Sequence, residues 1–165
     1  MPNVNITVAD DSPIAAFLAA IEISQESKLT LMNDIGRYFV RSTHQRIVNE
    51  VTPSGTPWKK SIRARATGGA TLRETNKLFN SVTYGVLSPD LLEYGTDVGY
   101  GIPLHFGQTV RAVAAEFLAF YIPGVGWAKR RSVTLEARPW LGVDTQDELA
   151  VIDIFTHFLE KVGDR

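Results

Sequence analysis

The sequence predicts an α+β fold, with most helices before a run of antiparallel strands and one helix after it. Two long stretches, 28–51 and 145–162, carry apolar residues at steps of three and four, the period of a helix packed on one side. Between them, short runs rich in β-branched and aromatic residues alternate with turn residues, which is typical of hairpins. Grouped rather than alternating helices and strands favour an α+β architecture with an antiparallel sheet.

The composition limits the kinds of protein that this chain can be. With 165 residues the chain is most simply a single domain, residues 1–165, that can bury a core without disulfides. It has no cysteine, and its net charge of -1 gives no overall field to attract nucleic acid or membrane. The first residues lack a signal-peptide pattern, and no apolar run approaches the roughly 18 residues of a membrane helix. We therefore expect a soluble intracellular protein that contacts no membrane.

The N-terminal part predicts a strand followed by two helices, one of them long. Residues 3–8 alternate polar and apolar side chains, as in a half-buried strand. Ser12 before Pro13 is a favourable helix start, so a short helix is expected over 13–23. The long helix, 28–51, places these residues on its apolar side: Leu29, Met32, Ile35, Gly36, Phe39, Val40, Thr43 and Ile47.

Residues 52–73 predict a long mobile basic loop. The stretch is rich in proline, glycine and cations, has no apolar period, and holds one large aromatic residue, Trp58, that we expect to pin it to the body. Its cations form a candidate interaction loop for a protein partner, with nucleic acid as the alternative: Lys59, Lys60, Arg63 and Arg65.

A short helix over 72–81 should dock through Leu78, and strands at 82–86 and 91–94 should pair across the turn at 88–90. The next stretch, 94–107, is dense in glycine and contains His105. We expect it to be a rigid corner between two hairpins, with Tyr100 and Phe106 packed on the sheet and His105 hydrogen-bonded within it.

A protruding hairpin is expected at about 109–136, turning at 123–127. Its basic run, Lys129, Arg130 and Arg131, is either a contact for nucleic acid or an acidic partner, or a solvated strand edge. The C-terminal helix should begin after Asp144 with Asp147 in a capping-box position. Its predicted apolar face consists of Leu149, Ile152, Phe155, Leu159 and Val162.

No arrangement in the sequence indicates catalysis. The histidines, His44, His105 and His157, fall on separate predicted elements, and no serine lies in a nucleophile elbow. The glycine-rich segments lack the spacing of dinucleotide or phosphate-binding loops. We expect no catalytic residue, no cofactor and no metal, and therefore not an enzyme.

Four segments in order resemble the phage virion morphogenesis (tail completion) family: SGTPW at 54–58, TNKLFNSV at 75–82, YGIPLHFG at 100–107 and ARPWLG at 137–142. Asn76 stands where the family pattern has glycine, and a second glycine after the histidine is missing. The residues that carry the resemblance as structural motif positions are Trp58, Leu78, Tyr100, His105, Phe106, Gly107, Arg138, Pro139 and Trp140.

The resemblance implies a virion structural protein of the neck, assembled in the host cytoplasm, that completes the tail and stabilises head–tail joining as a ring of copies. The implied partners are other copies, head-closure or connector proteins, and tail terminator or tail tube proteins. A tail terminator that caps the tail tube is the alternative within this class. DNA passing through an axial channel could contact the basic loop, and a nucleic-acid-binding module is the alternative from another class.

Overall fold

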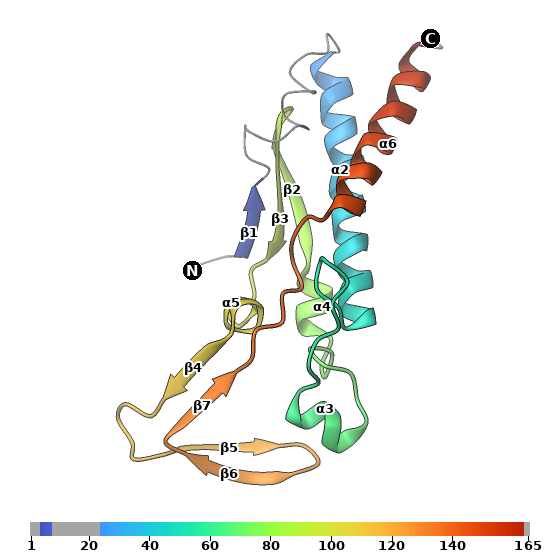
Figure 1. The fold of residues 1–165 in the computed structure, drawn as a ribbon. Coiled ribbons are helices and arrows are strands. Elements are labelled where there is room, and N and C mark those ends of the chain that lie inside the picture. Colours follow the sequence, from blue (N-terminus) through green and yellow to red (C-terminus); the bar gives the residue numbers. More distant parts are fainter. Residues whose placement is uncertain (1–3, 8–23, 164–165) are drawn as a thin grey trace.

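The α+β class is confirmed by a computed structural model that describes residues 4–7 and 24–163 (Figure 1). The helix predicted at 13–23 lies outside the described residues. The helices are α2 (Gln25–Asn49), α3 (Ile62–Thr67), α4 (Lys77–Ser81), α5 (Gly101–Phe106) and α6 (Thr145–Gly163). The strands are β1 (Val4–Thr7), β2 (Thr83–Ser88), β3 (Leu91–Thr96), β4 (Gln108–Arg111), β5 (Leu118–Ile122), β6 (Gly126–Arg130) and β7 (Ser132–Leu135).

The body of the molecule is an antiparallel sheet covered by the long helix. The strand order is β1-β3-β2, with β2 and β3 joined by the predicted turn and β1 paired along the other edge of β3. In Figure 1, α2 runs beside β2 and β3, and α6 lies along α2. The predicted N-terminal strand and the first hairpin are therefore confirmed.

The contact of α2 with the sheet is close because small and flat side chains meet there. The ring of Phe39 stacks on that of Tyr94 at 4.7 Å between centroids and 9° between planes. Gly36 lies against the ring of Tyr84, where any Cβ would overlap the ring carbons. At the start of the helix, the Ser24 hydroxyl accepts the backbone N–H of Ser27 at 3.2 Å, as an N-cap does.

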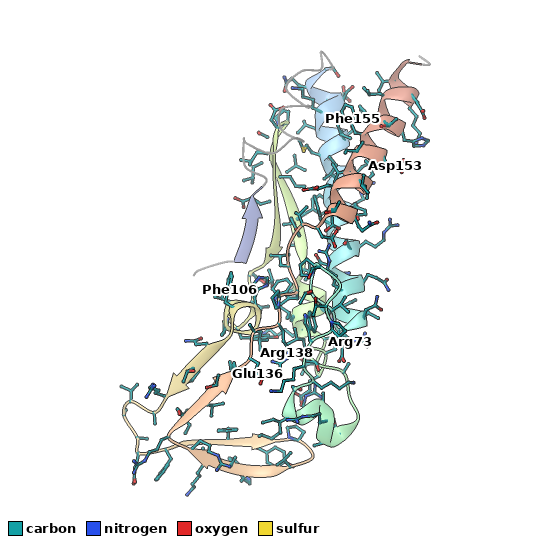
Figure 2. The ribbon with its side chains drawn as sticks, viewed as in Figure 1. Arg73, Phe106, Glu136, Arg138, Asp153 and Phe155 are labelled. Atoms are coloured by element: carbon teal, nitrogen blue, oxygen red, sulfur yellow. The ribbon has the colours of Figure 1, made fainter. Side chains whose placement is uncertain are left out.

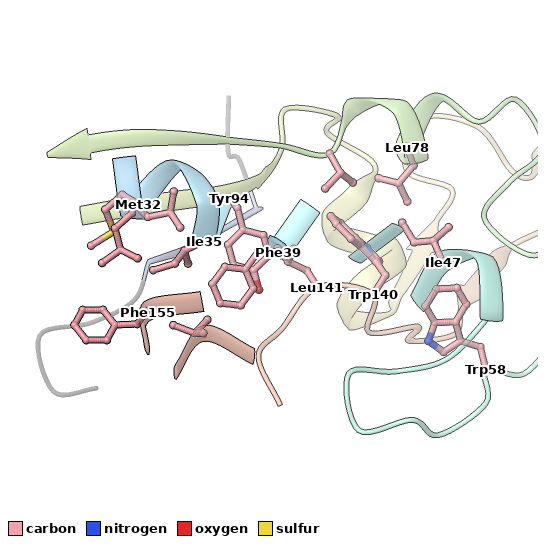
Figure 3. Packing of buried hydrophobic residues seen from close by; sticks show 14 residues of the cluster. Met32, Ile35, Phe39, Ile47, Trp58, Leu78, Tyr94, Trp140, Leu141 and Phe155 are labelled. Atoms are coloured by element: carbon pink, nitrogen blue, oxygen red, sulfur yellow. The ribbon is translucent and has the colours of Figure 1, made fainter. Parts of the chain in front are cut away.

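One continuous apolar core joins α2, β3, α6 and the segment around Trp140 (Figure 3). Met32, Ile35 and Phe39 of α2 face Tyr94 of β3 at one end of it. Farther along, Trp140 lies among Leu78, Ile47 and Trp58 in the same view. Of the predicted apolar side of α2, Leu29 is the exception, because it is 40% exposed.

The start of α6 has the predicted capping box. The backbone N–H of Asp147 donates to the Asp144 carboxylate at 2.9 Å, and the N–H of Asp144 donates to the Asp147 carboxylate at 2.9 Å. These reciprocal bonds satisfy backbone donors that a helix N-terminus otherwise leaves unpaired.

The predicted apolar face of α6 is wrong at three positions. Leu149 is 55% exposed, Ile152 50% and Val162 39%, while Val151 and Phe155 are buried. The reason is that Asp147 is itself buried, and residues four and eight positions later follow it onto the same side of a helix. A charged residue therefore fixes which side of α6 faces the core.

Asp147 is buried because it belongs to a polar network between α2 and α6. Its carboxylate accepts from the Arg46 guanidinium, from the Tyr38 hydroxyl at 3.0 Å and from the Ser42 hydroxyl at 2.7 Å. Arg46, also buried, donates to the carbonyl of Gly142 at 2.6 Å. Burial alone would raise the pKa of Asp147, but the Asp144 N–H, Ser42 and Arg46 outweigh it and hold the pKa below its usual value.

The predicted hairpin at 109–136 forms a broken arm rather than one continuous ladder. We use "the arm" for residues 108–135. Its inner ribbon pairs β4 with β7, and its outer ribbon pairs β5 with β6. Residues 112–117, predicted as part of a strand, interrupt the ladder, and Figure 1 shows the outer ribbon turning from the inner one toward α3.

The stretch predicted as a loop at 52–73 contains regular structure. Residues 62–67 form α3, which begins where the Ser61 hydroxyl accepts the N–H of Ala64 at 3.1 Å. The helix ends at Gly68, whose φ of 70° suits glycine. The sequence lacks an apolar period here because only Ala64 of this helix is buried. The mobility of the stretch stays a prediction.

Replacing Asp147 with asparagine should destabilise the fold in a pH-dependent way. Arg46 would lose its main counter-charge while staying buried, so we expect a loss on the order of 3 kcal/mol in the free energy of unfolding near neutral pH. Because the pKa of Asp147 is lowered by folding, its contribution is complete above the usual value of about 4 and is lost as the pH falls through the folded value.

The measurement is urea unfolding of the wild type and Asp147→Asn at several pH values, where the difference should narrow below about pH 4. The matched control is Asp153→Asn, an exposed aspartate of the same helix, which should stay within about 0.5 kcal/mol of wild type. The same large difference at pH 7 and pH 3 would contradict the ion-pair account.

Candidate functional site

The four segments that carry the family resemblance meet around one buried side chain, Trp140, which is fully buried (Figure 3). Its indole N–H donates to the carbonyl of Gly101 at 3.4 Å, and its backbone N–H donates to Nδ1 of His105 at 3.4 Å. Trp58 donates its indole N–H to the carbonyl of Pro139 at 3.0 Å. Leu78 of α4 is buried in the same cluster. We call this cluster the junction, because the arm leaves the body here.

The stretch expected to be a corner is the short helix α5, which joins β3 to β4 at the junction. Gly107 ends it with a φ of 77°, and a Cβ there would lie 2.9 Å from the backbone nitrogen of Ala137. Glycine is therefore required both by conformation and by space. The prediction that aromatic rings of this stretch pack on the sheet is wrong for Phe106, which is 68% exposed, and Tyr100 is 41% exposed.

His105 packs against aromatic rings and accepts a backbone hydrogen bond. Burial lowers its pKa, which favours the neutral ring that can accept the N–H of Trp140. The ring also lies edge-on to the rings of Phe106 and Trp140, with centroid distances of 4.5 and 5.8 Å. The predicted bond within its own stretch is therefore replaced by one to the segment that follows the arm.

The other histidines lie apart from His105. His44 donates from Nε2 to the carbonyl of Phe79 at 2.8 Å and stacks on the ring of Phe79. His157 is exposed on α6, 3.5 Å from Glu160. Within residues 4–7 and 24–163, no group of histidine and carboxylate side chains could hold a metal ion.

A groove of about 740 Å³ lies between the arm and the segment around α3. One wall is residues 59–65, and the other comes from both ribbons of the arm and the segment that follows them. The apolar part of the lining consists of Ile62, Val110, Leu118, Ala119, Phe120, Ile122, Ala128, Val133 and Leu135. The charged part consists of Glu136 and six cations, namely Lys59, Lys60, Arg63, Arg65, Arg130 and Arg138. We call these apolar residues the floor of the groove and these six cations its rim.

Specific contacts hold the two walls together. Arg138, which is buried, donates to the carbonyls of Lys59 at 3.0 Å and Glu136 at 3.1 Å. Figure 2 shows Arg138 and Glu136 where the chain leaves β7. At the tip of the outer ribbon, a Cβ on Gly124 would lie 2.8 Å from Cγ2 of Thr67. The tip of the arm and the segment that follows the arm thus both contact the region around α3.

Most of the groove's cations already have carboxylate partners. Lys59 pairs with Glu136 at 2.5 Å, and Lys60 pairs with Glu50 at 3.4 Å. The Lys59 ammonium is the main reason why the pKa of Glu136 is lowered. Arg63 lies 3.3 Å from Glu74, and Arg138 lies 3.8 Å from Glu136.

The remaining two cations of the rim, Arg65 and Arg130, form no ion pair with any other described residue. The other four cations share three carboxylates, those of Glu136, Glu50 and Glu74, so one of their positive charges stays unbalanced and this pair supplies the other two. They lie on opposite walls of the groove, one on α3 and one on β6.

The structure brings the candidate interaction loop together with only one residue of the basic run at 129–131. Arg130 lines the groove, whereas Lys129 is exposed outside it. Arg131 is also outside, 3.7 Å from Glu116 and over the ring of Phe117. Alternation along a strand explains the division, since neighbouring side chains point to opposite faces.

Sequence reasoning missed the role of Arg138 in joining the walls and the closeness of α3 to the arm. Arg138 was picked out only by the motif at 137–142. The contact between Gly124 and Thr67 depends on how the broken arm folds back, and no local pattern encodes that path.

In the described part of the chain, no helix is long and apolar enough to cross a membrane.

Replacing Arg138 with alanine should loosen the wall of the groove formed by 59–65. The variant loses charge-assisted bonds to the carbonyls of Lys59 and Glu136, each worth roughly 1.5–3 kcal/mol. Limited trypsin digestion should therefore cut after Lys59, Lys60, Arg63 or Arg65 at least about tenfold faster than in wild type. Arg130→Ala is the control, because Arg130 bonds only the carbonyl of neighbouring Lys129 among the described residues. Unchanged cleavage in Arg138→Ala would contradict this account.

Comparison with known proteins identifies the family. The model of the phage virion morphogenesis family matches residues 9–160, which confirms the resemblance inferred from the four segments. No curated protein and no solved structure matches the chain. The match covers α2 through most of α6, including the junction, the arm and the groove. The chain therefore belongs to the phage virion morphogenesis family, and its role lies in assembly of the phage virion.

Proposed function

We propose that the chain is a structural component of the virion neck, where a ring of copies completes the tail and stabilises its joining to the head. The observation that carries the proposal is the convergence of the family's segments on the junction around Trp140. These segments build the frame from which the arm projects. In a protein that assembles with other subunits, we expect the segments typical of its family to build a rigid frame from which an arm projects.

The surface of the arm supports a role in protein contact. Trp127 is 79% exposed, Tyr121 is 57% exposed, and their rings meet edge to face at 5.8 Å. Val125 at the tip is 58% exposed, and Val113 at the break is 96% exposed. Large apolar side chains gathered on one projecting element are characteristic of protein interaction surfaces.

The proposed role needs no catalysis. His105 is committed to the N–H of Trp140, and among the described residues no serine or carboxylate is paired with it. The proposed partners are other copies of the chain, head-closure or connector proteins, and tail terminator or tail tube proteins. The alternative within the same class is a tail terminator.

A nucleic-acid-binding module fits the groove less well. Phosphate binding needs cations free to replace counterions, but four of the six cations of the rim are paired with carboxylates. The floor is apolar, which a phosphate backbone cannot use. DNA in an axial channel would at most be steered by the exposed cations of the arm.

Deleting the gene in its phage should yield full heads and separate tails of normal length, visible by negative-stain electron microscopy. Supplying the wild-type chain from a plasmid should restore joined particles. Supplying His105→Gln should also restore them, because a glutamine oxygen can still accept the N–H of Trp140. Joined, infectious virions without the chain would refute the proposal. Tails of uncontrolled length would instead support the terminator alternative.

A further inference from the structure

The groove and the outer side of α6 are complementary surfaces of the same chain. The groove offers an apolar floor with a basic rim, whose two cations without an ion pair among the described residues are Arg65 and Arg130. Its two walls are held together by Arg138 and by the tip of the arm. A volume of about 740 Å³ is in the range that buries several side chains.

The outer side of α6 is apolar along its centre and acidic at its edges. Leu149 and Ile152, at 55% and 50% exposure, are three positions apart and therefore adjacent on the helix surface. Glu148 and Asp153, each four positions from one of them, flank them on the helix surface, and both are exposed. Leu149 and Ile152 therefore form an apolar strip between carboxylates. This strip is complementary to the groove, whose apolar floor lies between arginines.

These two surfaces cannot meet within one molecule. Figure 1 shows the arm at one end, with α6 running from the middle of the molecule toward the other end. Asp153, labelled in Figure 2, lies in the part of the molecule away from the arm. The side of α6 that faces α2 is occupied by Asp147, Val151 and Phe155, so the outer side is left for another molecule.

We propose that the groove of one copy binds the outer side of α6 of the next copy. Leu149 and Ile152 enter the apolar floor, while Glu148 and Asp153 face Arg130 and Arg65. The charge complementarity of these surfaces and the matching apolar centres identify the occupant as a second copy of this chain. The inference rests on the proposed role as an oligomeric part and names the interface that builds the oligomer.

The contact joins two different patches, so each bound copy still offers one free groove and one free α6. Such a heterologous contact propagates from copy to copy and closes into a ring when the rotation per copy permits. The paired cations of the rim also have a purpose in this arrangement. They hold the groove's shape and add only one unbalanced positive charge, because four cations share three carboxylates, so recognition rests chiefly on Arg65 and Arg130.

Charge reversal on each surface tests the contact directly. The groove variant is Arg65→Glu with Arg130→Glu, and the helix variant is Glu148→Arg with Asp153→Arg. Each variant alone places like charges opposite each other, so the dissociation constant of the oligomer should rise at least about 100-fold. In an equimolar mixture, each surface of one variant finds its complement on the other, and the oligomer should return. The chain carrying all four substitutions should also assemble.

Matched controls change the same charge elsewhere. Arg41→Glu with Lys77→Glu, and Glu26→Arg with Asp97→Arg, alter exposed residues outside the groove and α6 and should leave the oligomer intact. Native mass spectrometry and sedimentation velocity of the full chain supply the oligomeric state, and circular dichroism confirms that each variant is folded. Binding of a fluorescent double-stranded DNA at low salt is measured in parallel.

The possible outcomes distinguish a failure of the proposed interface from a failure of the proposed function. An oligomer that persists in both variants, or a wild-type chain that is monomeric at all concentrations, overturns the interface. DNA affinity that is lost in the groove variant, with no change in oligomeric state, shows that the groove is a DNA site and also overturns it. If the variants behave as expected but phages carrying the groove variant still join heads to tails, the interface stands and the neck role fails.

Discussion

The buried ion pair between Arg46 and Asp147 is the constraint on which the rest of the structure depends. It fastens α6 to α2, and its charges are compensated by Tyr38, Ser42 and the capping box of α6. Arg46 and Tyr94 both donate to the carbonyl of Gly142, so the sheet is joined to the same point. An ion pair of this kind adds specificity more than raw stability, because desolvation offsets much of its attraction. Here it selects the rotation of α6.

The rotation of α6 that this ion pair selects affects the chain on both sides of Asp147. Toward the C-terminus it buries Val151 and Phe155 and turns Leu149 and Ile152 to solvent. Toward the N-terminus it fixes the segment that carries Trp140 and Arg138, which position the junction and hold the α3 segment beside the arm. The groove and the outer side of α6 are therefore both positioned by one common interaction, as the proposed contact between copies would require.

Much of the fold could be predicted from the sequence, because local patterns encode it. The apolar period of α2, the turn between β2 and β3, and the capping box at Asp144 and Asp147 all follow from neighbouring residues. The side of α6 could not be predicted, because apolar residues occur around most of that helix and a distant arginine decides which face is buried. The break in the arm was not predicted because residues 112–117 contain no glycine or proline, while Val113 and Phe117 fit the strand pattern on either side. The candidate site was predicted only as two separate basic stretches, whose meeting depends on how the arm folds back.

The central claim is that this chain is an architectural part of the virion neck, held to its neighbours by surfaces that the buried ion pair sets. A cryo-electron microscopy reconstruction of the head–tail junction in intact virions tests it most directly. The account predicts a ring of copies at the junction, with α6 of each copy seated in the groove of the next. A reconstruction that resolves every protein of the junction and contains no copy of this chain would contradict it.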